Sequence, residues 1–277
     1  MTPPAIVAAV ATLVSIALLV LIAVRIKRLG KQQKRILKHL KALEQEGRTR
    51  DINQFRQIVA HEELQRRIAP GHSLPSMRGW AISPDFGLLL TDLIDSNRPK
   101  TIVELGSGTS TLLCAYQLKK LGRGEVIAID HEPAFAQQTR EQIRRHGLED
   151  YARVISTRLR SSEYVDLQGE PIDWYDLAAA QPLPDHIDLM IVDGPPMSYG
   201  ADVRYPALPA FEHRLSANAA VLLDDAARPG EQRIVARWAS EFPDFKVVNA
   251  EAEKGAAILL RAGTPGEADH ASENTGA

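Results

Sequence analysis

One stretch, residues 101–112, constrains the fold more than any other: Thr-Ile-Val-Glu-Leu-Gly-Ser-Gly-Thr-Ser-Thr-Leu. Residues 102–105 have the character of a short buried strand. Gly106 and Gly108 then predict a tight turn at which the backbone can approach a ligand closely. Apolar residues at helical spacing predict a helix over 110–121. A strand, a glycine turn and a helix N-terminus together form the front of a nucleotide-type pocket.

A second apolar strand is predicted over residues 124–130, and it ends in Asp130. This acid follows Gly106 at about the spacing of a ribose-binding acid, roughly 20 residues. Two nucleotide classes fit the turn poorly. A phosphate-binding P-loop needs a lysine after the turn, and none is present, while Thr111 occupies the third position of the nicotinamide fingerprint.

Two later apolar strands also end in acids. Residues 186–193 end in Asp193, which Gly-Pro-Pro follows at once, and residues 219–225 end in Asp224 and Asp225. Helices are predicted over 84–94, 133–146 and 231–240, and a closing pair of strands over 245–249 and 256–261. Alternating strands and helices predict an α/β fold, and such sheets place their chemistry at the carboxyl ends of the strands.

The Glu-x-Gly-x-Gly motif followed by a strand-end acid resembles the class I S-adenosylmethionine-dependent methyltransferases over roughly residues 75–262. The resemblance implies a Rossmann-like, doubly wound sheet of seven strands, mostly parallel, with an antiparallel last strand. It also implies S-adenosylmethionine as the cofactor. The residues implied to bind it are Glu104, Gly106, Ser107, Gly108, Thr109, Asp130 and His131.

Asp193 is the candidate catalytic residue, because a hydroxyl acceptor needs a nearby base or a divalent metal ion to become a good nucleophile. In the cation-dependent O-methyltransferases, acids at the ends of these two strands hold magnesium. That likeness implies Mg²⁺ or Mn²⁺ on Asp193 and Asp225, although Ala226 stands where the family has an amide ligand. The alternative is that these acids cap turns and helices.

The Asp-Gly-Pro turn at residues 193–195 resembles plant polysaccharide methyltransferases and suggests O-methylation of a saccharide or another small hydroxylated acceptor. Two other functions stay open. One is aminopropyl transfer on the same fold, although no paired acids of a polyamine-binding segment are found. The other is a non-catalytic scaffold that keeps the cofactor-binding shell.

The N-terminal part predicts a different environment. Residues 5–24 carry no charged side chain, and this run has about the length of a bilayer-spanning helix. Basic residues follow from Arg25 onward. We therefore expect a transmembrane anchor over 1–24, a basic helical stalk over 25–70, a methyltransferase domain over 71–262 and a disordered tail over 263–277. Basic flanks favour the cytoplasmic side, so a single-pass inner-membrane protein with a cytoplasmic catalytic domain is expected. A cleaved signal peptide is the alternative.

Within the stalk, Leu29, Ile36 and Leu43 are seven residues apart, which supports a helix and weakly a coiled-coil homodimer. Residues 25–50 hold ten Lys/Arg and two Glu, a local charge of +8, so the net charge of −2 leaves about −10 elsewhere. An acidic main domain is a poor match for a nucleic acid. Trp80 and Cys114 are expected in the core, and residues 160–184, with Trp174 among them, in an irregular loop.

Overall fold

The computed structural model describes residues 3–261, with side chains from residue 12 onward, so the predicted disordered tail lies outside the described residues. The chain divides into two compact units, Met1–Phe55 and Arg56–Ala277. Helix α1 (Pro3–Ile68) forms the first unit and continues into the second. It is unbroken at Gly30 and Gly47. Leu29, Ile36 and Leu43 are all exposed on it, and the predicted homodimer stays a prediction.

The predicted transmembrane segment is not supported by the structure. In the described part of the chain, no helix combines the length and the apolar character that crossing a bilayer requires.

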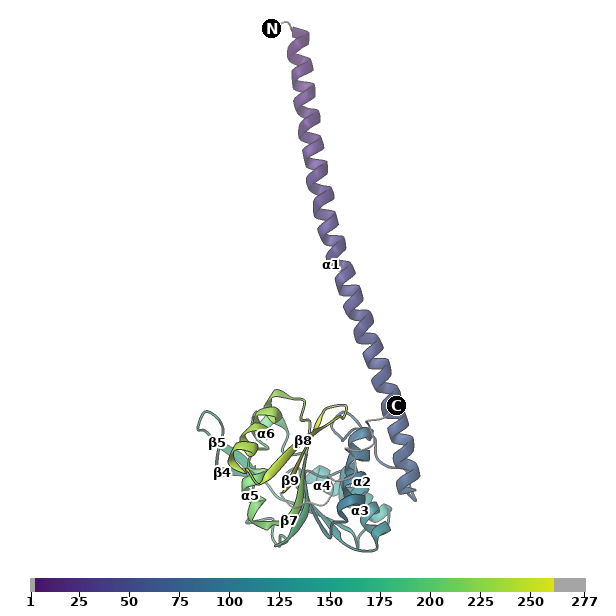
Figure 1. Cartoon of the computed structure of the whole chain (residues 1–277), viewed down its shortest axis with the longest axis vertical. Helices are drawn as coiled ribbons and strands as arrows, with labels where there is room; N and C mark the ends of the chain where they lie inside the picture. The colour runs from purple at the N-terminus through teal and green to yellow at the C-terminus, as the bar shows by residue number, and fades with distance from the viewer. Residues whose placement is uncertain (1–2, 262–277) are drawn as a thin grey trace, which may run out of the picture. The chain divides into compact units, whose positions relative to one another are not determined.

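The second unit is built on a seven-stranded sheet with the strand order β3-β2-β1-β6-β7-β9-β8. Figure 1 labels three neighbouring strands of this sheet, β7, β9 and β8. Its strands are β1 (Thr101–Leu105), β2 (Glu125–Asp130), β3 (Ala152–Ser156), β6 (Ile187–Val192), β7 (Leu215–Asp224), β8 (Phe245–Ala250) and β9 (Ala256–Arg261). β9 runs antiparallel to both of its neighbours, whereas the other pairs are parallel. The expected α/β fold with one antiparallel closing strand is therefore confirmed.

Helices cover both faces of this sheet because alternate residues of each strand point to opposite sides. On β1, Val103 and Leu105 join one core and Ile102 joins the other. The first core contains residues of α5 (Ala207–Phe211) and α6 (Pro229–Glu241). The second contains residues of α2 (Pro84–Asn97), α3 (Thr109–Leu121) and α4 (Pro133–Arg145), together with Cys114 as expected.

Two expectations about aromatic residues and loops are wrong. The segment expected to be irregular forms an antiparallel hairpin of β4 (Leu159–Val165) and β5 (Pro171–Tyr175), and Trp174 on it is only 1% exposed. It packs edge-on against Tyr164, Tyr175 and Phe211, so it is a core residue. Trp80, expected in the core, is instead 87% exposed, because it lies in an irregular turn before α2 and not on a helix face.

Candidate functional site

The glycine turn lies between β1 and α3, as predicted. Gly106 and Gly108 have φ values of 108° and 152°. Residues other than glycine rarely adopt this region, so glycine is required at both positions. Thr109 begins α3 and is buried. The turn therefore presents backbone at the N-terminus of a helix, where an anionic or polar ligand group finds free N–H donors.

Glu104 lies beneath this turn and has no solvent exposure. The hydroxyl of Thr111 donates to Glu104 Oε2 at 2.5 Å and accepts from the backbone N–H of Gly108 at 3.0 Å. Burial raises the pKa of Glu104 to about 7, although the hydrogen bond from Thr111 acts in the opposite direction. Its other oxygen, Oε1, is buried and has no hydrogen-bond donor. Glu104 therefore shapes the turn and also brings an unsatisfied acceptor to it.

Asp130, at the end of β2, is fixed beside the same turn. Its Oδ2 accepts from the hydroxyl of Ser107 at 2.5 Å and its Oδ1 from the backbone N–H of Glu132 at 2.9 Å. Each carboxylate oxygen can accept a second hydrogen bond, so a ligand diol can still be bound. His131 follows, and its ring lies edge-on to Tyr175 and Tyr199, with centroids 6.1 and 5.2 Å away.

Asp193 follows β6 and lies directly next to the glycine turn. Its backbone N–H donates to the carbonyl oxygen of Leu105 at 3.0 Å. A Cβ atom added to Gly106 would be 3.7 Å from the backbone carbon of Asp193. The following Gly194 has no room for a side chain, because its Cβ would lie 2.5 Å from the hydroxyl of Tyr175. The tight Asp-Gly-Pro turn thus brings the candidate catalytic acid beside the cofactor turn.

Asp224 ends β7 and Asp225 follows it, and one oxygen of each lies within 4.8 Å of an Asp193 oxygen. Asp225 has a φ of 62°, a left-handed conformation that aspartate tolerates better than most residues. Its backbone N–H donates to Asp224 Oδ1 at 2.7 Å. The structure therefore brings together the three strand-end acids that the sequence singled out.

A buried arginine that the sequence analysis did not single out as a site residue holds this acid cluster together. Arg204 Nη2 is 3.4 Å from Asp193 Oδ1 and 3.1 Å from Asp225 Oδ2, and its Nη1 is 3.6 Å from Glu231 Oε1. Arg204 also donates to the backbone oxygens of Asp193 and Asp224, at 2.7 and 3.0 Å. One guanidinium thus joins the ends of β6 and β7.

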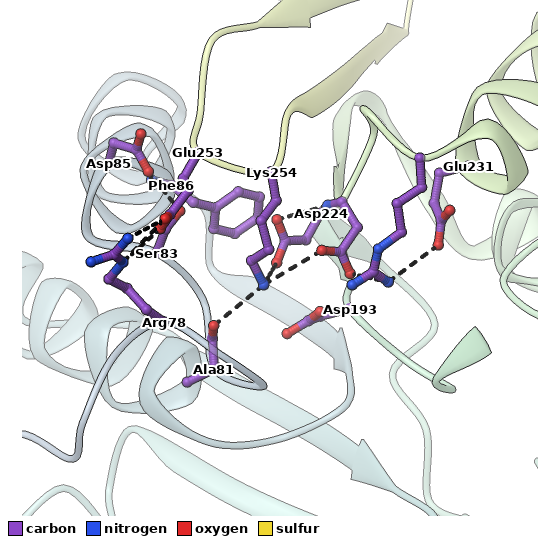
Figure 2. A network of polar contacts seen from close by, with 12 residues as sticks. Arg78, Ala81, Ser83, Asp85, Phe86, Asp193, Asp224, Glu231, Glu253 and Lys254 are labelled. Atoms are coloured by element: carbon purple, nitrogen blue, oxygen red, sulfur yellow. Dashed lines mark hydrogen bonds and ion pairs between the residues drawn. The ribbon is translucent and has the colours of Figure 1, made fainter. Parts of the chain in front are cut away.

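Lys254 and Arg228 supply two more cations. Lys254 Nζ is 3.3 Å from Asp224 Oδ2 (Figure 2) and 3.4 Å from Asp225 Oδ1. Arg228 Nη1 is 2.7 Å from Asp225 Oδ2. Burial raises the pKa of Asp193 well above its usual value, and the charge of Asp224 adds to this rise while Arg204 opposes it. Asp193 is also the most accessible of the three acids, with 18% of its side chain exposed.

The residues fit S-adenosylmethionine. The unpaired Glu104 Oε1 and the unpaired hydroxyl of Tyr175 are both buried polar atoms without a hydrogen-bond partner. Both can interact with a ligand that carries positive and donor groups, and Asp130 suits its ribose hydroxyls. Sequence reasoning missed Tyr175 because it lies at the end of the hairpin strand β5, in the segment expected to be irregular.

The same residues do not fit a divalent metal ion. Mg²⁺ and Mn²⁺ take about six oxygen ligands in near-octahedral arrangement. Here Arg204, Arg228 and Lys254 already lie against Asp193, Asp224 and Asp225, and Ala226 offers no side-chain ligand. The acids are paired with cations of the chain itself and do not form a metal ion's set of ligands.

A comparison with known protein families identifies the type of domain that carries this site. Residues 103–226, which run from β1 to the acid cluster, match a family model described as a methyltransferase domain. No curated protein matches the sequence. Among solved structures, a methyltransferase from Podospora anserina with bound S-adenosylhomocysteine has a TM-score of 0.50 and 18% identity, over 73% of this chain and 87% of that one. This likeness shows the fold.

Two further solved structures are similar at lower TM-scores. An O-methyltransferase from Bacillus cereus in complex with S-adenosylhomocysteine has a TM-score of 0.49 and 18% identity, over 76% of this chain and 97% of that one. An O-methyltransferase from Streptomyces achromogenes, involved in tomaymycin synthesis, has a TM-score of 0.48 and 17% identity, over 75% and 89% of the two chains. The matched domain, the strand order and the glycine turn agree: residues 103–226 form a methyltransferase domain on a class I, Rossmann-like fold.

Proposed function

We propose that this methyltransferase transfers the methyl group to a hydroxyl oxygen of a saccharide or another small hydroxylated acceptor. One observation supports the proposal most: Asp193, the most accessible acid of the cluster, lies against the glycine turn through its hydrogen bond to Leu105. A base at this place can take the proton of an acceptor hydroxyl while the acceptor faces the cofactor.

Each residue of the site would have a separate role in the transfer. S-adenosylmethionine, when bound, supplies an electrophilic methyl group. The glycine turn and Asp130 orient the ligand, and Asp193 accepts the acceptor's proton on a carboxylate oxygen. Arg204 holds Asp193 in place through both its backbone and its side-chain oxygen. The raised pKa of Asp193 makes it a stronger base than an ordinary aspartate once it is ionised.

The direct test is methyl transfer from S-adenosylmethionine with a labelled methyl group, offered to the purified chain with saccharides, small phenols and amines. We expect the label in an ether linkage on a hydroxylated acceptor. Label only on amines, or transfer of an aminopropyl group from the decarboxylated cofactor, would contradict the proposal.

Cofactor affinity should depend on pH through Glu104. With a pKa of about 7, Glu104 is largely protonated at pH 6 and ionised at pH 8. A positively charged ligand favours the ionised form, so affinity should rise with pH and level off above about 7. The rise between pH 6 and 8 should reach about tenfold at most. Isothermal titration calorimetry checks this, because binding below pH 7 should release a proton to the buffer.

The matched control for that prediction is Glu104→Gln, which keeps the shape of the side chain and cannot ionise. Its affinity should vary little over the same pH range. S-adenosylhomocysteine lacks the sulfonium charge and should show a shallower rise with the unaltered chain. An equally steep rise in Glu104→Gln would assign the pH dependence to another group.

Location at the cytoplasmic face of a membrane is a separate proposal, supported by the sequence alone. Residues 1–24 carry no charged side chain and the basic run from Arg25 favours anionic lipid headgroups. We expect the full chain to sediment with membranes and to stay there in high salt, while a chain lacking residues 1–24 is released by salt. Fractionation followed by immunoblotting measures this. Release of the full chain by salt alone would contradict the proposal.

A further inference from the structure

One of the three cations at the acid cluster, Lys254, comes from the last hairpin of the sheet. Lys254 lies in the turn between β8 and β9, and Gly255 beside it has a φ of 73°. A Cβ on Gly255 would lie 2.6 Å from the backbone nitrogen of Ala227. The turn therefore packs backbone to backbone against the loop that follows Asp225, and only glycine permits this approach.

Two backbone hydrogen bonds fix this contact. The N–H of Ala226 donates to the carbonyl oxygen of Gly255 at 3.1 Å, and the N–H of Ala227 donates to the carbonyl oxygen of Lys254 at 3.0 Å. The position of the lysine is thus set by the backbone of both loops. Its ammonium group does not reach the acids by chance rotation of a long surface side chain.

The ammonium group lies among three oxygens from two segments, the end of β7 and the turn before α2. Nζ is 3.3 Å from Asp224 Oδ2, 3.4 Å from Asp225 Oδ1 and 3.3 Å from the carbonyl oxygen of Ala81 (Figure 2). The side chain is 20% exposed, so the charge is largely withdrawn from water. A divalent ion bound to the same two carboxylate oxygens, at about 2.1 Å from each, would be forced against this ammonium. Arg204 and Arg228 contact the other oxygen of Asp225, Oδ2, so Lys254 is the cation that competes with a metal ion for these two oxygens.

Lys254 also links the acids to the segment in front of α2. The neighbouring Glu253 receives a bidentate ion pair from Arg78, whose Nε is 2.9 and 3.1 Å from its two oxygens. Arg78 also closes a tight turn, because its N–H donates to the carbonyl oxygen of Ile82 at 2.9 Å. The exposed Trp80 lies inside this turn, so Lys254 and Glu253 hold the turn that carries it.

We propose that Lys254 is a built-in substitute for the metal ion of cation-dependent relatives: it neutralises Asp224 and Asp225, anchors the Trp80 turn beside the acceptor site, and makes the reaction independent of divalent cations. Lys254 acts here as a positioning residue, through the acids and the turn. This inference rests on the proposed function for the acceptor site, but its charge argument concerns the acid cluster alone.

The first experiment measures Mn²⁺ binding to the purified full chain by electron paramagnetic resonance, without any acceptor. The unaltered chain should bind no Mn²⁺ at the cluster at millimolar concentration. Lys254→Met keeps most of the side-chain stem and removes the charge, and it should gain a Mn²⁺ site. Lys254→Arg keeps the charge and should gain none. Lys120→Met removes an exposed positive charge from α3 and serves as the control, because it should not gain a Mn²⁺ site.

The second experiment measures methyl transfer. Treatment with a chelator should leave the activity of the unaltered chain unchanged. Lys254→Met should lose about tenfold or more in turnover, because the acids and the Trp80 turn lose their anchor. Magnesium or manganese should restore part of this loss, and Lys254→Arg should retain more activity than Lys254→Met.

Three results would overturn the inference: Mn²⁺ binding at the cluster of the unaltered chain, loss of its activity with a chelator, or a folded Lys254→Met that gains no Mn²⁺ site. A second variant, Lys254→Gln, covers the case in which the methionine variant does not fold. Mn²⁺ binding requires no turnover, so a failure of the proposed acceptor class leaves this arm of the test readable.

Discussion

Replacing Asp193 with asparagine is expected to lower turnover by about 10² to 10⁴, the usual contribution of a positioned base, while cofactor affinity changes little. Asparagine keeps the shape and the backbone hydrogen bond to Leu105 but cannot accept a proton. The loss should therefore appear in kcat and not in the dissociation constant of S-adenosylmethionine. Steady-state kinetics with calorimetric titration separates the two quantities.

The pH profile sharpens this prediction. Burial and the charge of Asp224 raise the pKa of Asp193, and a base works only in its ionised form. Turnover of the unaltered chain should therefore rise with pH through this raised pKa, and the residual turnover of Asp193→Asn should lack that rise. Asp188→Asn is the matched control, because Asp188 lies near the amino end of the same strand, β6. There its carboxylate accepts hydrogen bonds from the backbone N–H groups of Lys100 and Thr101. Equal losses in both variants would assign a structural role to Asp193.

Replacing Arg204 with methionine is expected to cost about 3–5 kcal/mol of folding stability at neutral pH, the scale for removing one partner of a buried ion pair. Its side chain is 4% exposed, and it faces Asp193, Asp225 and Glu231. Methionine fills similar volume, so the loss arises from carboxylates left without their cation. Urea unfolding followed by circular dichroism measures it.

The loss of folding stability in Arg204→Met should become smaller as the pH falls. Burial already raises the pKa of Asp193 and Glu231, and loss of Arg204, which opposes that rise, raises both further. Protonation at lower pH then removes the uncompensated charges, so the variant approaches the stability of the unaltered chain. Arg228→Met, whose side chain is 38% exposed, should cost much less at every pH. Equal losses of folding stability in Arg204→Met and Arg228→Met would contradict the conclusion that the buried ion pairs of Arg204 cause the larger loss.

The sequence predicted those parts of the molecule that rest on short-range patterns. The apolar runs at 102–105, 186–193 and 219–225 predicted buried strands, and β1, β6 and β7 lie there. The parallel sheet places the acids at the ends of these strands. Gly106 and Gly108 were identifiable because a turn with positive φ between strand and helix requires glycine. The acid cluster was likewise predictable, since neighbouring parallel strands end at one edge.

The cations of the site were not predictable in the same way. Lys254 stands in a charged turn whose sequence contains no pattern that distinguishes a buried ammonium from a solvated one. Its contact with Asp224 depends on the close approach of Gly255 to Ala227, a long-range packing property. Arg204 offered a weak signal, as a single charge within the mostly apolar run of residues 203–211. Trp80 was wrongly predicted to lie in the core because aromatic residues are usually buried. It lies in an irregular turn, where no helical periodicity indicates which side chains face the core.

The contact between Gly255 and Ala227 also bears on how a metal requirement could arise or disappear in this family. The three acids belong to the central strands, which form the core, whereas the competing cation comes from a peripheral hairpin that adds only one lysine. Exchange of this turn alone would remove the cation that competes at Asp224 and Asp225, with every acid left in place. Cation dependence in such folds would then be inherited with the C-terminal hairpin, and sorting relatives by their strand-end acids would misassign it.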